Sequence, residues 1–434
     1  MTISNNLIRS IGKLIVPSKL REKRALWLQT RIPRTKRKVK RVLKRIKRHN
    51  HAKIGFIASS MGMWKYNHLY KLLNDDSRFE VIALIMPFGG YAEEAKEKEI
   101  QQLSAHFEIN NIDYKIVKSP SDFLQIKKEK GIDLLFYPQP YFGMYGLGCN
   151  WHDNTDCLIC YVPYYLGLSE WWWTCDLPFH NVCWKQFMPT EIHKREIAKV
   201  ARNKGNNILV VGDLRKDDFR TPSHSDPWRK INDGNERKRL IWAPHFQLSK
   251  DAVFSRPAFE WTSDVMLHLA KKYRNKLQIA FKPHPRLRSE LYKNPEWGKE
   301  KTDNYYKEWE TMSNTQIEQG DYTDLFIHSD ALIHNCGSFT GEYLYVDKPV
   351  AFTSKNIDEV LESMHEFGMK CMEAHTIVSN EQQIEDFVEK VVLEGEDPLK
   401  DIRKKMIKDF MNPNGTKPSS QRMFESLIHS LELS

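Results

Sequence analysis

Short apolar runs recur along this chain from residue 53 onward, and polar segments with helical patterning separate them. Each run is too short for a helix and has the length of a β-strand. Strands that alternate with helices form parallel crossover units, because two parallel neighbours need a long connection. The pattern therefore predicts an α/β protein. Its strands are expected at 53–59, 79–87, 114–117, 134–137, 157–164, 208–211, 240–243, 277–281, 331–333 and 350–352.

A helical segment at 190–203 divides these strands into two series. The chain has 434 residues, which is enough for two domains with separate cores. Its hydrophobic content of 41%, with 12% aromatic residues, excludes a disordered protein. We expect three parts: a basic arm over 1–50, a first Rossmann-like domain over 51–195 and a second over 196–434. Two such domains facing a cleft form the GT-B architecture.

The positive charge of the chain lies in the arm. Residues 1–50 contain 17 Lys or Arg and one acidic residue, Glu22. They carry +16 whereas the whole chain carries +10, so the remainder carries −6. Within the arm, Val39, Val42, Leu43 and Ile46 recur at helical spacing among the cations. This pattern predicts a basic amphipathic helix of the kind that lies on an anionic membrane.

The arm has two other interpretations: it could bind nucleic acid, or it could be a solvated charge run that binds nothing. We favour the membrane and expect no nucleic-acid partner, because no recognised nucleic-acid module or aromatic stacking residue accompanies the charges. No stretch approaches the roughly 18 apolar residues of a spanning helix. Seven cysteines in a long chain without an obvious secretory signal indicate a reducing compartment. We therefore expect a cytoplasmic protein, peripheral on the inner face of the cell membrane.

Cys157 and Cys160 form a C-x-x-C motif, which in other contexts binds zinc. Here both lie within an apolar run that is typical of a buried strand, where a free cysteine behaves as a small hydrophobic residue. We expect no metal site at this motif, and nothing else in the sequence requires a metal or a cofactor.

A histidine between two prolines follows the predicted strand 277–281. Lys282, His284 and Arg286 lie in this turn. The carboxyl ends of parallel strands are where open α/β sheets bind ligands. His284 is therefore a candidate catalytic residue, with Lys282 and Arg286 as candidate ligand-binding residues.

A second turn, after strand 331–333, leads into a helical segment. Backbone N–H groups at such a helix start face an anion, Gly337 allows close approach, and Ser338 and Thr340 supply hydroxyl groups. An ordinary capped helix after a buried strand would give the same pattern. We expect this turn to bind the phosphates of a nucleotide.

The predicted strand ends at Gly212, His245, His284 and Gly337 would share one edge of one sheet. We regard this coincidence as more informative than any single motif. It adds Gly212 and His245 to the candidate ligand-binding residues.

The second half of the chain resembles the bacterial CDP-glycerol glycerophosphotransferase family, the polymerases and primases of teichoic acid and related capsules. The resemblance is best over 208–352. It rests on the motifs Gly-Asp-Leu-Arg-Lys-Asp at 212–217, Ile-Trp-Ala-Pro at 241–244, Lys-Pro-His-Pro at 282–285, and the segment 329–349. It implies that His284 contacts a donor pyrophosphate, that Ser338 and its helix start hold the phosphates, and that Arg215 of the first motif lies at the donor site.

This sequence also departs from the family pattern. Gly337 replaces one of two paired serines, and Asn335 and Glu342 replace aspartates. The family's N-terminal tryptophan–histidine–glycine motif is replaced by Tyr-Val-Pro-Tyr-Tyr-Leu-Gly at 161–167. An acceptor hydroxyl still needs a base within reach. The candidates from the first half are His68 and His180.

The resemblance implies transfer of glycerol phosphate, or another polyol phosphate, from a CDP-linked donor to a cell-surface polysaccharide, a teichoic-acid-like polymer or a lipid-linked acceptor. The alternative is a GT-B glycosyltransferase that uses a nucleotide sugar, in which Glu342 would grip the nucleotide ribose. A third hypothesis is a lipid- or nucleic-acid-binding protein with an inactive transferase body.

Overall fold

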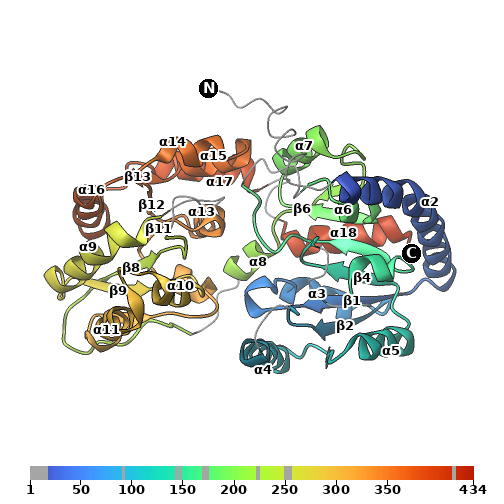
Figure 1. Ribbon diagram of the computed structural model, residues 1–434, viewed down its shortest axis with the longest axis horizontal. Helices are drawn as coiled ribbons and strands as arrows, with labels where there is room; N and C mark the ends of the chain where they lie inside the picture. Colours follow the sequence, from blue (N-terminus) through green and yellow to red (C-terminus); the bar gives the residue numbers. More distant parts are fainter. Residues whose placement is uncertain are drawn as a thin grey trace.

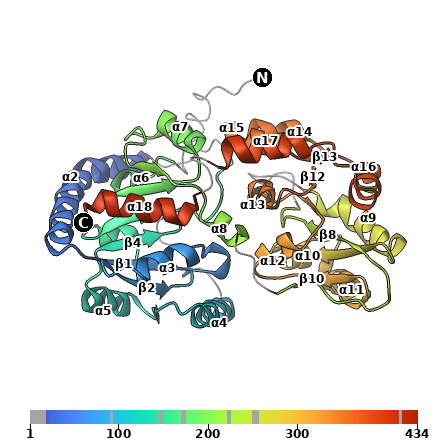
Figure 2. The same ribbon diagram turned by 180° about the vertical axis from the view of Figure 1, so that it is seen from behind.

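The computed structural model describes residues 18–89, 93–141, 145, 149–168, 175–220, 225–248, 257–412 and 417–434, with side chains from residue 34 onward. Two lobes lie side by side, each built around one parallel sheet (Figure 1). The short helix α8 (Arg215–Arg220) lies between them in both views (Figures 1 and 2). The expected α/β architecture with two Rossmann-like units is confirmed.

The first lobe contains a seven-stranded sheet with the order β3-β2-β1-β4-β5-β6-β7. Every neighbouring pair is parallel. The strands are β1 (Ala52–Ala58), β2 (Phe79–Ile85), β3 (Tyr114–Ile116), β4 (Leu134–Tyr137), β5 (Leu158–Tyr161), β6 (Lys185–Met188) and β7 (Ile208–Val210). The connecting segments contain η1 (Met61–Met63), α3 (Asn67–Asn74), α4 (Glu93–Ile109), α5 (Pro120–Lys130), η2 (Trp151–Asn154), α6 (Pro178–Val182) and α7 (Glu191–Val200).

The second lobe contains a six-stranded parallel sheet with the order β10-β9-β8-β11-β12-β13. Its strands are β8 (Lys238–Ala243), β9 (Leu277–Phe281), β10 (Thr315–Ile317), β11 (Ala331–His334), β12 (Val350–Thr353) and β13 (Thr376–Val378). Its helical segments are α9 (Phe259–Lys272), α10 (Leu287–Lys293), α11 (Gly298–Thr311), α12 (Thr323–Ile327), α13 (Gly337–Glu342), η4 (Tyr343–Val346), α14 (Ile357–Glu362), α15 (Glu366–Glu373), α16 (Glu381–Asp386), the π-helical η5 (Phe387–Leu393) and α17 (Lys400–Phe410).

The boundary between the lobes differs from the one we expected at residue 195. Strand β7 pairs with β6 and completes the first sheet, whereas its sequence position made it the first strand of the second series. The last helix, α18 (Ser419–Leu431), also returns to the first lobe, where it packs on α3. A local apolar run predicts a strand but does not specify which sheet the strand joins, and this explains the error.

The cysteines of the C-x-x-C motif lie inside the first lobe, as expected. Cys157 and Cys160 are 2% and 0% exposed, and the Cys157 thiol donates to the carbonyl of Ile132 at 3.2 Å. Burial raises the pKa of the Cys157 thiol to about 12. The two thiols therefore act as small apolar groups of the core.

The arm forms the long helix α2 (Ser18–His49), and residues 1–17 lie outside the described part of the chain. Val42 and Ile46 of this helix are buried in the core of the first lobe, and Val39 and Leu43 pack against it. The apolar face that we expected to lie on lipid is thus covered by protein over residues 34–49. The cationic face points to solvent, because burial of the apolar stripe orients the helix.

We expect Ile46→Ala to lower the free energy of unfolding by about 2–4 kcal/mol, because the side chain is fully buried and its removal leaves a cavity. Urea unfolding would measure this change. The exposed Lys44 on the same helix provides the control, and Lys44→Ala should leave stability nearly unchanged. An unchanged stability for Ile46→Ala would contradict the packing of α2 on the lobe.

Candidate functional site

Three of the four predicted strand ends meet at one edge of the second sheet. His245 follows β8, His284 follows β9, and their rings lie 4.9 Å apart. The His245 backbone N–H donates to the side chain of Asn335, after β11, at 2.7 Å, and the His284 N–H donates to the carbonyl of Pro244 at 3.1 Å. The carboxyl ends of adjacent parallel strands thus bring these residues together, with Gly337 at the start of α13.

Gly212 does not belong to this edge, because it follows β7 in the first sheet. Its φ of +95° favours glycine, and a Cβ atom there would clash with the Ser419 hydroxyl. The residue is therefore required for close packing of α18. The expectation that it shares an edge with His245 and His284 is wrong.

His284 is held as a neutral imidazole. Burial and the nearby Arg286 guanidinium lower its pKa to about 4. Its Nδ1 accepts a hydrogen bond from the Arg286 backbone N–H at 3.1 Å, so in the neutral ring the proton lies on Nε2. The ring remains half-exposed beside Phe246. His284 can therefore offer an N–H donor to a ligand oxygen at neutral pH.

The two cations near His284 have different environments. Lys282 is 7% exposed, and its ammonium donates to the carbonyl of Gly320 at 2.9 Å. Burial lowers the pKa of Lys282. Arg286 is exposed, with its guanidinium stacked 4.1 Å from the Phe246 ring and paired with Glu290 at 3.1 Å. Lys282 thus fixes the loop below the site, whereas Arg286 faces solvent.

Helix α13 begins beside this pair of histidines. Ser338 is half-buried, and Thr340 is fully buried with its hydroxyl donating to the carbonyl of Cys336 at 3.2 Å. Cys336, the residue before the helix, provides no side-chain cap. The backbone N–H groups at this helix start and the Ser338 hydroxyl are therefore placed near the histidines, whereas the Thr340 hydroxyl is satisfied within the helix.

A buried network joins this edge to the first lobe. The Lys65 ammonium, in the loop after β1, lies 2.8 Å from the Asp213 carboxylate, and both side chains are 3% exposed. The hydroxyl of Tyr345 donates to the other carboxylate oxygen at 2.8 Å. Burial alone would raise the pKa of Asp213, but Lys65 and Tyr345 hold it below its ordinary value. The carboxylate is thus charged and shared between the two lobes.

Arg215, at the start of α8, extends this network. It donates to the carbonyls of Gly62 at 2.8 Å and Trp64 at 3.2 Å in the first lobe. Its guanidinium also lies 5.2 Å from the ring of Tyr322 and 3.8 Å from the carboxylate of Asp321, both in the second lobe. The side chain is 4% exposed, so Arg215 joins the lobes instead of facing an open cleft.

Glu342 is buried at the end of α13, where its carboxylate accepts a hydrogen bond from the hydroxyl of Tyr322. Burial raises its pKa to about 7, although the nearby Arg215 opposes this shift. With the residue 2% exposed, the carboxylate lies beneath Tyr322 and not in position to grip a ribose.

The two candidate bases have different positions. His68 on α3 is 36% exposed, and its Nε2 lies 3.4 Å from the carboxylate of Asp218 on α8. His180 is 1% exposed, its Nδ1 accepts from the Leu177 N–H at 3.0 Å, and its ring packs on Tyr161. His68 therefore lies at the surface between the lobes, whereas His180 has a structural position at the start of α6. Asp218 was missed, although a pair of adjacent aspartates after a predicted strand end was visible in the sequence.

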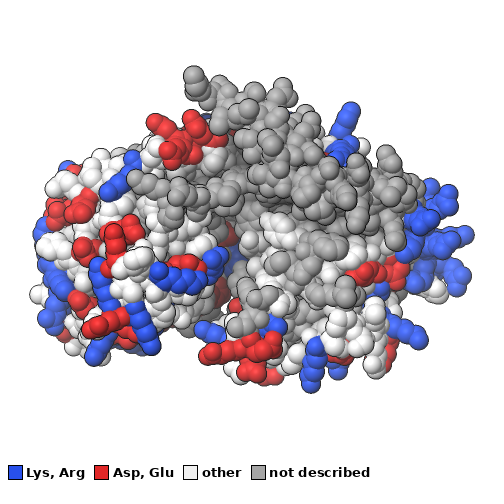
Figure 3. Space-filling model, viewed as in Figure 1, with Lys and Arg blue, Asp and Glu red and all other residues white. Residues whose placement is uncertain are grey.

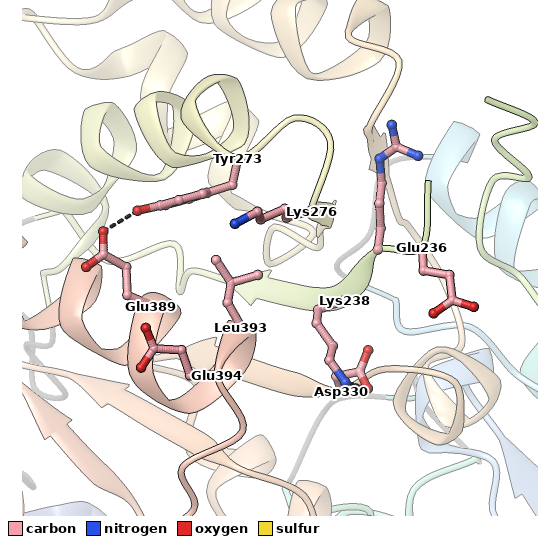
Figure 4. Close-up of a pocket in the computed structure, with 9 residues that line it drawn as sticks. Glu236, Lys238, Tyr273, Lys276, Asp330, Glu389, Leu393 and Glu394 are labelled. Carbon is pink, nitrogen blue, oxygen red and sulfur yellow. Dashed lines mark hydrogen bonds and ion pairs between the residues drawn. The ribbon is translucent and has the colours of Figure 1, made fainter. Parts of the chain in front are cut away.

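The space between the lobes is hollowed in the surface view, and charged side chains of both signs lie at its margin (Figure 3). A different pocket, of about 680 Å³, lies at the amino end of the second sheet (Figure 4). There Tyr273 donates to Glu389, and Lys238 lies 4.0 Å from Asp330. Acidic and basic side chains pair within this pocket, and it lies at the opposite edge of the sheet from the carboxyl ends of the strands. Ligands bind at the carboxyl ends in such sheets, so we do not propose this pocket as the ligand site. In the described residues, no group of three or more His, Cys, Asp or Glu side chains is arranged to hold a metal ion.

We expect Glu342→Gln to alter how stability depends on pH. Folding raises the pKa of the Glu342 carboxyl to about 7, so the folded protein binds this proton more tightly than the unfolded chain does. The stabilisation it contributes at low pH is therefore lost as pH rises from about 4.5 through 7, by at most about 1.4 kcal/mol per pH unit. A glutamine side chain does not titrate, so the variant should not lose this stability as pH rises. Urea unfolding between pH 5 and 8 measures it, with the exposed Glu359→Gln as the control; parallel curves for wild type and Glu342→Gln would contradict the assignment.

Several solved structures share this architecture. S. aureus MnaA bound to UDP has a TM-score of 0.57 at 15% identity, covering 88% of this chain and 98% of the other. UDP-GlcNAc 2-epimerase from Neisseria meningitidis has a TM-score of 0.55 at 13% identity, with coverage of 87% and 100%. A variant of the wall teichoic acid polymerase TagF has a TM-score of 0.57 at 12% identity, with coverage of 96% and 99%. At these identities the likeness shows the fold alone, and it supports the GT-B-like arrangement.

No curated protein sequence matches the chain significantly. A family model described as CDP-glycerol:poly(glycerophosphate) glycerophosphotransferase does match, over residues 183–427. The matched segment runs from the residues before β6 into α18 and contains the histidine edge, α8 and α13. It spans more than half of the chain and confirms the resemblance seen in the sequence. The chain belongs to the CDP-glycerol:poly(glycerophosphate) glycerophosphotransferase family.

Proposed function

We propose that this chain transfers glycerol phosphate from CDP-glycerol to a hydroxyl group of a teichoic-acid-like acceptor. The family match covers the whole edge that carries His245, His284 and α13. One of the similar TagF structures was obtained after a soak with CDPG. The observation that carries the proposal is the neutral, half-exposed His284 at the carboxyl end of β9. Among the described residues, its Nε2–H has no hydrogen-bond partner, so it could donate to a bound donor.

Transfer of a phosphoryl group requires positioning and stabilisation of negative charge more than covalent chemistry by the protein. In this proposal His284 donates a hydrogen bond to the donor pyrophosphate, and the exposed Arg286 guanidinium supplies positive charge beside it. The Ser338 hydroxyl and the backbone N–H groups at the start of α13 hold phosphate oxygens. Lys282, Arg215 and Glu342 support this surface from below through their buried contacts.

A nucleotide-sugar glycosyltransferase is the less favoured alternative. The fold does not separate the two, because UDP-GlcNAc 2-epimerases share it as closely as TagF does. That alternative uses Glu342 as a ribose ligand, and the buried contact of Glu342 with Tyr322 argues against this role. Turnover with CDP-glycerol, CDP-ribitol and a panel of UDP and CMP sugars would distinguish the donors.

We further propose that the cationic face of α2 binds an anionic membrane surface. Exposed cations cover this face, and Lys and Arg gather at the same end of the molecule in the surface view (Figure 3). Since the apolar face is buried in the lobe, the attraction would be electrostatic, without insertion of α2 into the lipid. In the described residues, no helix is long and apolar enough to cross a bilayer.

His284→Ala should lower kcat for transfer from CDP-glycerol at least about a hundredfold, because it removes a donor that faces developing charge. The exposed His268 on α9 gives a matched control, and His268→Ala should keep the wild-type rate. Steady-state release of CMP is the measurement. A near-normal rate for His284→Ala would refute its role at the donor, and a wild-type protein that uses only nucleotide sugars would refute the proposed reaction.

Replacing Lys40, Arg41, Lys44 and Arg48 by Gln should weaken binding to phosphatidylglycerol vesicles by about 1 kcal/mol per charge and leave turnover unchanged. These four side chains are exposed on α2. Sedimentation with vesicles at low salt measures the binding. The control replaces four exposed lysines of the second lobe, Lys299, Lys307, Lys404 and Lys408, by Gln. Equal losses for the two variants would show that net charge alone, and not the face of α2, determines binding.

A further inference from the structure

A histidine and an aspartate face each other where α3 of the first lobe contacts α8. The Nε2 atom of His68 lies 3.4 Å from an Oδ1 atom of Asp218. The histidine is 36% exposed and the aspartate 16%, so the carboxylate lies on the inner side of the imidazole. In the described part of the chain, no hydrogen-bond partner contacts Nδ1 of His68. The ring is thus held from one side and open on the other.

The helix that carries Asp218 is anchored at two points. Asp217 accepts hydrogen bonds from the backbone N–H groups of Ser419 at 3.0 Å and Ser420 at 2.7 Å, which ties α8 to the start of α18. Arg215 ties the same helix to backbone carbonyls in the loop after β1. Since α8 is fixed at both of these points, Asp218 is presented to the imidazole by a rigid element.

Burial and several charged neighbours act on the Asp218 carboxyl. Burial raises the pKa of Asp218 to about 7, with Arg215 opposing and Asp321, Asp217 and Asp213 supporting the shift. A carboxylate next to an imidazole stabilises the imidazolium and selects the tautomer that carries its proton on the facing nitrogen. Here the facing nitrogen is Nε2, which leaves the lone pair on the open Nδ1.

We infer that Asp218 is a positioning residue that orients His68, so that Nδ1 of His68 removes the proton from the acceptor hydroxyl. The inference rests on the proposed glycerophosphotransferase function and deepens it. Both residues lie at the carboxyl edge of the first sheet, since α3 follows β1 and α8 follows β7. That edge faces the donor edge through Arg215, Asp321 and Tyr322. A base on the first lobe is therefore opposite the donor groups on the second.

The transfer step balances with this assignment. The acceptor oxygen forms a bond to the phosphorus that carries glycerol, and its proton passes to Nδ1 of His68. The bond from that phosphorus to the bridging oxygen breaks, and CMP leaves with the oxygen and the electron pair. The Asp218 carboxylate, which faces Nε2, stabilises the imidazolium by its charge until the imidazole releases its proton to solvent. The step requires no oxidant, reductant or further reactant.

Kinetics with CDP-glycerol and an acceptor test the pair. His68→Gln should lower kcat at least about a hundredfold, and Asp218→Asn at least about tenfold. The Kd for CDP-glycerol, measured by calorimetry, should change less than about threefold, since neither residue lies at the donor edge. The double variant should be no slower than His68→Gln alone, because Asp218 acts through His68. Asp218→Glu should recover part of the rate, and the exposed Asp75→Asn is the matched control.

A second readout does not depend on turnover. In ¹H–¹⁵N NMR spectra of the histidine rings, with His68 assigned from the His68→Gln spectrum, wild type should show the tautomer with its proton on Nε2, and Asp218→Asn should lose that preference. Asp75→Asn should leave the tautomer unchanged. An unchanged His68 tautomer in Asp218→Asn, or losses in the double variant that multiply, would overturn the inference.

The outcomes for the two proposals are separable. If wild type does not transfer glycerol phosphate from CDP-glycerol, the proposed function fails and this inference fails with it. If wild type transfers glycerol phosphate and His68→Gln does so at a similar rate, the assignment of the base alone is overturned.

Discussion

The buried carboxylate of Asp213 links the two lobes. It forms an ion pair with Lys65 inside the first lobe and accepts a hydrogen bond from Tyr345 of the second lobe. Both charges are removed from water, so their hydrogen bonds must offset the cost of desolvation. Arg215 adds contacts to backbone carbonyls on one lobe and to an aromatic ring on the other. Removal of one partner from such a pair costs about 3–5 kcal/mol, because the remaining charge stays buried. The distance between the two sheet edges is therefore specified by electrostatics as well as by packing.

The two lobes place a histidine in different surroundings on either side of the hollow. Burial and Arg286 keep His284 neutral and make it a donor. On the opposite lobe, the carboxylate of Asp218 faces Nε2 of His68 at 3.4 Å. In the proposed reaction, His284 would donate to the negative charge of the donor, and His68 would face the acceptor hydroxyl. The two rings are chemically identical, so any difference between them arises from their neighbours.

Much of the edge that carries His245 and His284 was predictable, because it depends on local signals. Apolar runs that end in polar turns predicted that His245, His284 and the start of α13 follow strand ends. In the structure, parallel pairing of these strands brings the residues together. The features that were not predictable depend on the choice between sheets or on burial. Strand β7 has the same local pattern as the strands of the second sheet, so Gly212 was placed on the wrong edge. The stripe on α2 indicated an amphipathic helix correctly, but periodicity does not tell whether lipid or protein covers the apolar face. Arg215 was proposed from its motif and Glu342 as a ribose-binding carboxylate, and a motif does not reveal that both side chains are buried in a network between the lobes.

The return of α18 to the first lobe has a consequence for synthesis. Met423, Leu427 and Leu431 belong to the core that also contains Leu69 and Leu73 of α3. The first sheet ends at residue 210, and α18 begins only at residue 419. A ribosome adds about 5–20 residues per second, so α18 is synthesised roughly 10–40 s after the first sheet is complete. Until then, α18 cannot pack on the apolar side of α3. During that interval the nascent first lobe exposes an apolar surface, and a chaperone that shields it would aid production of the folded chain.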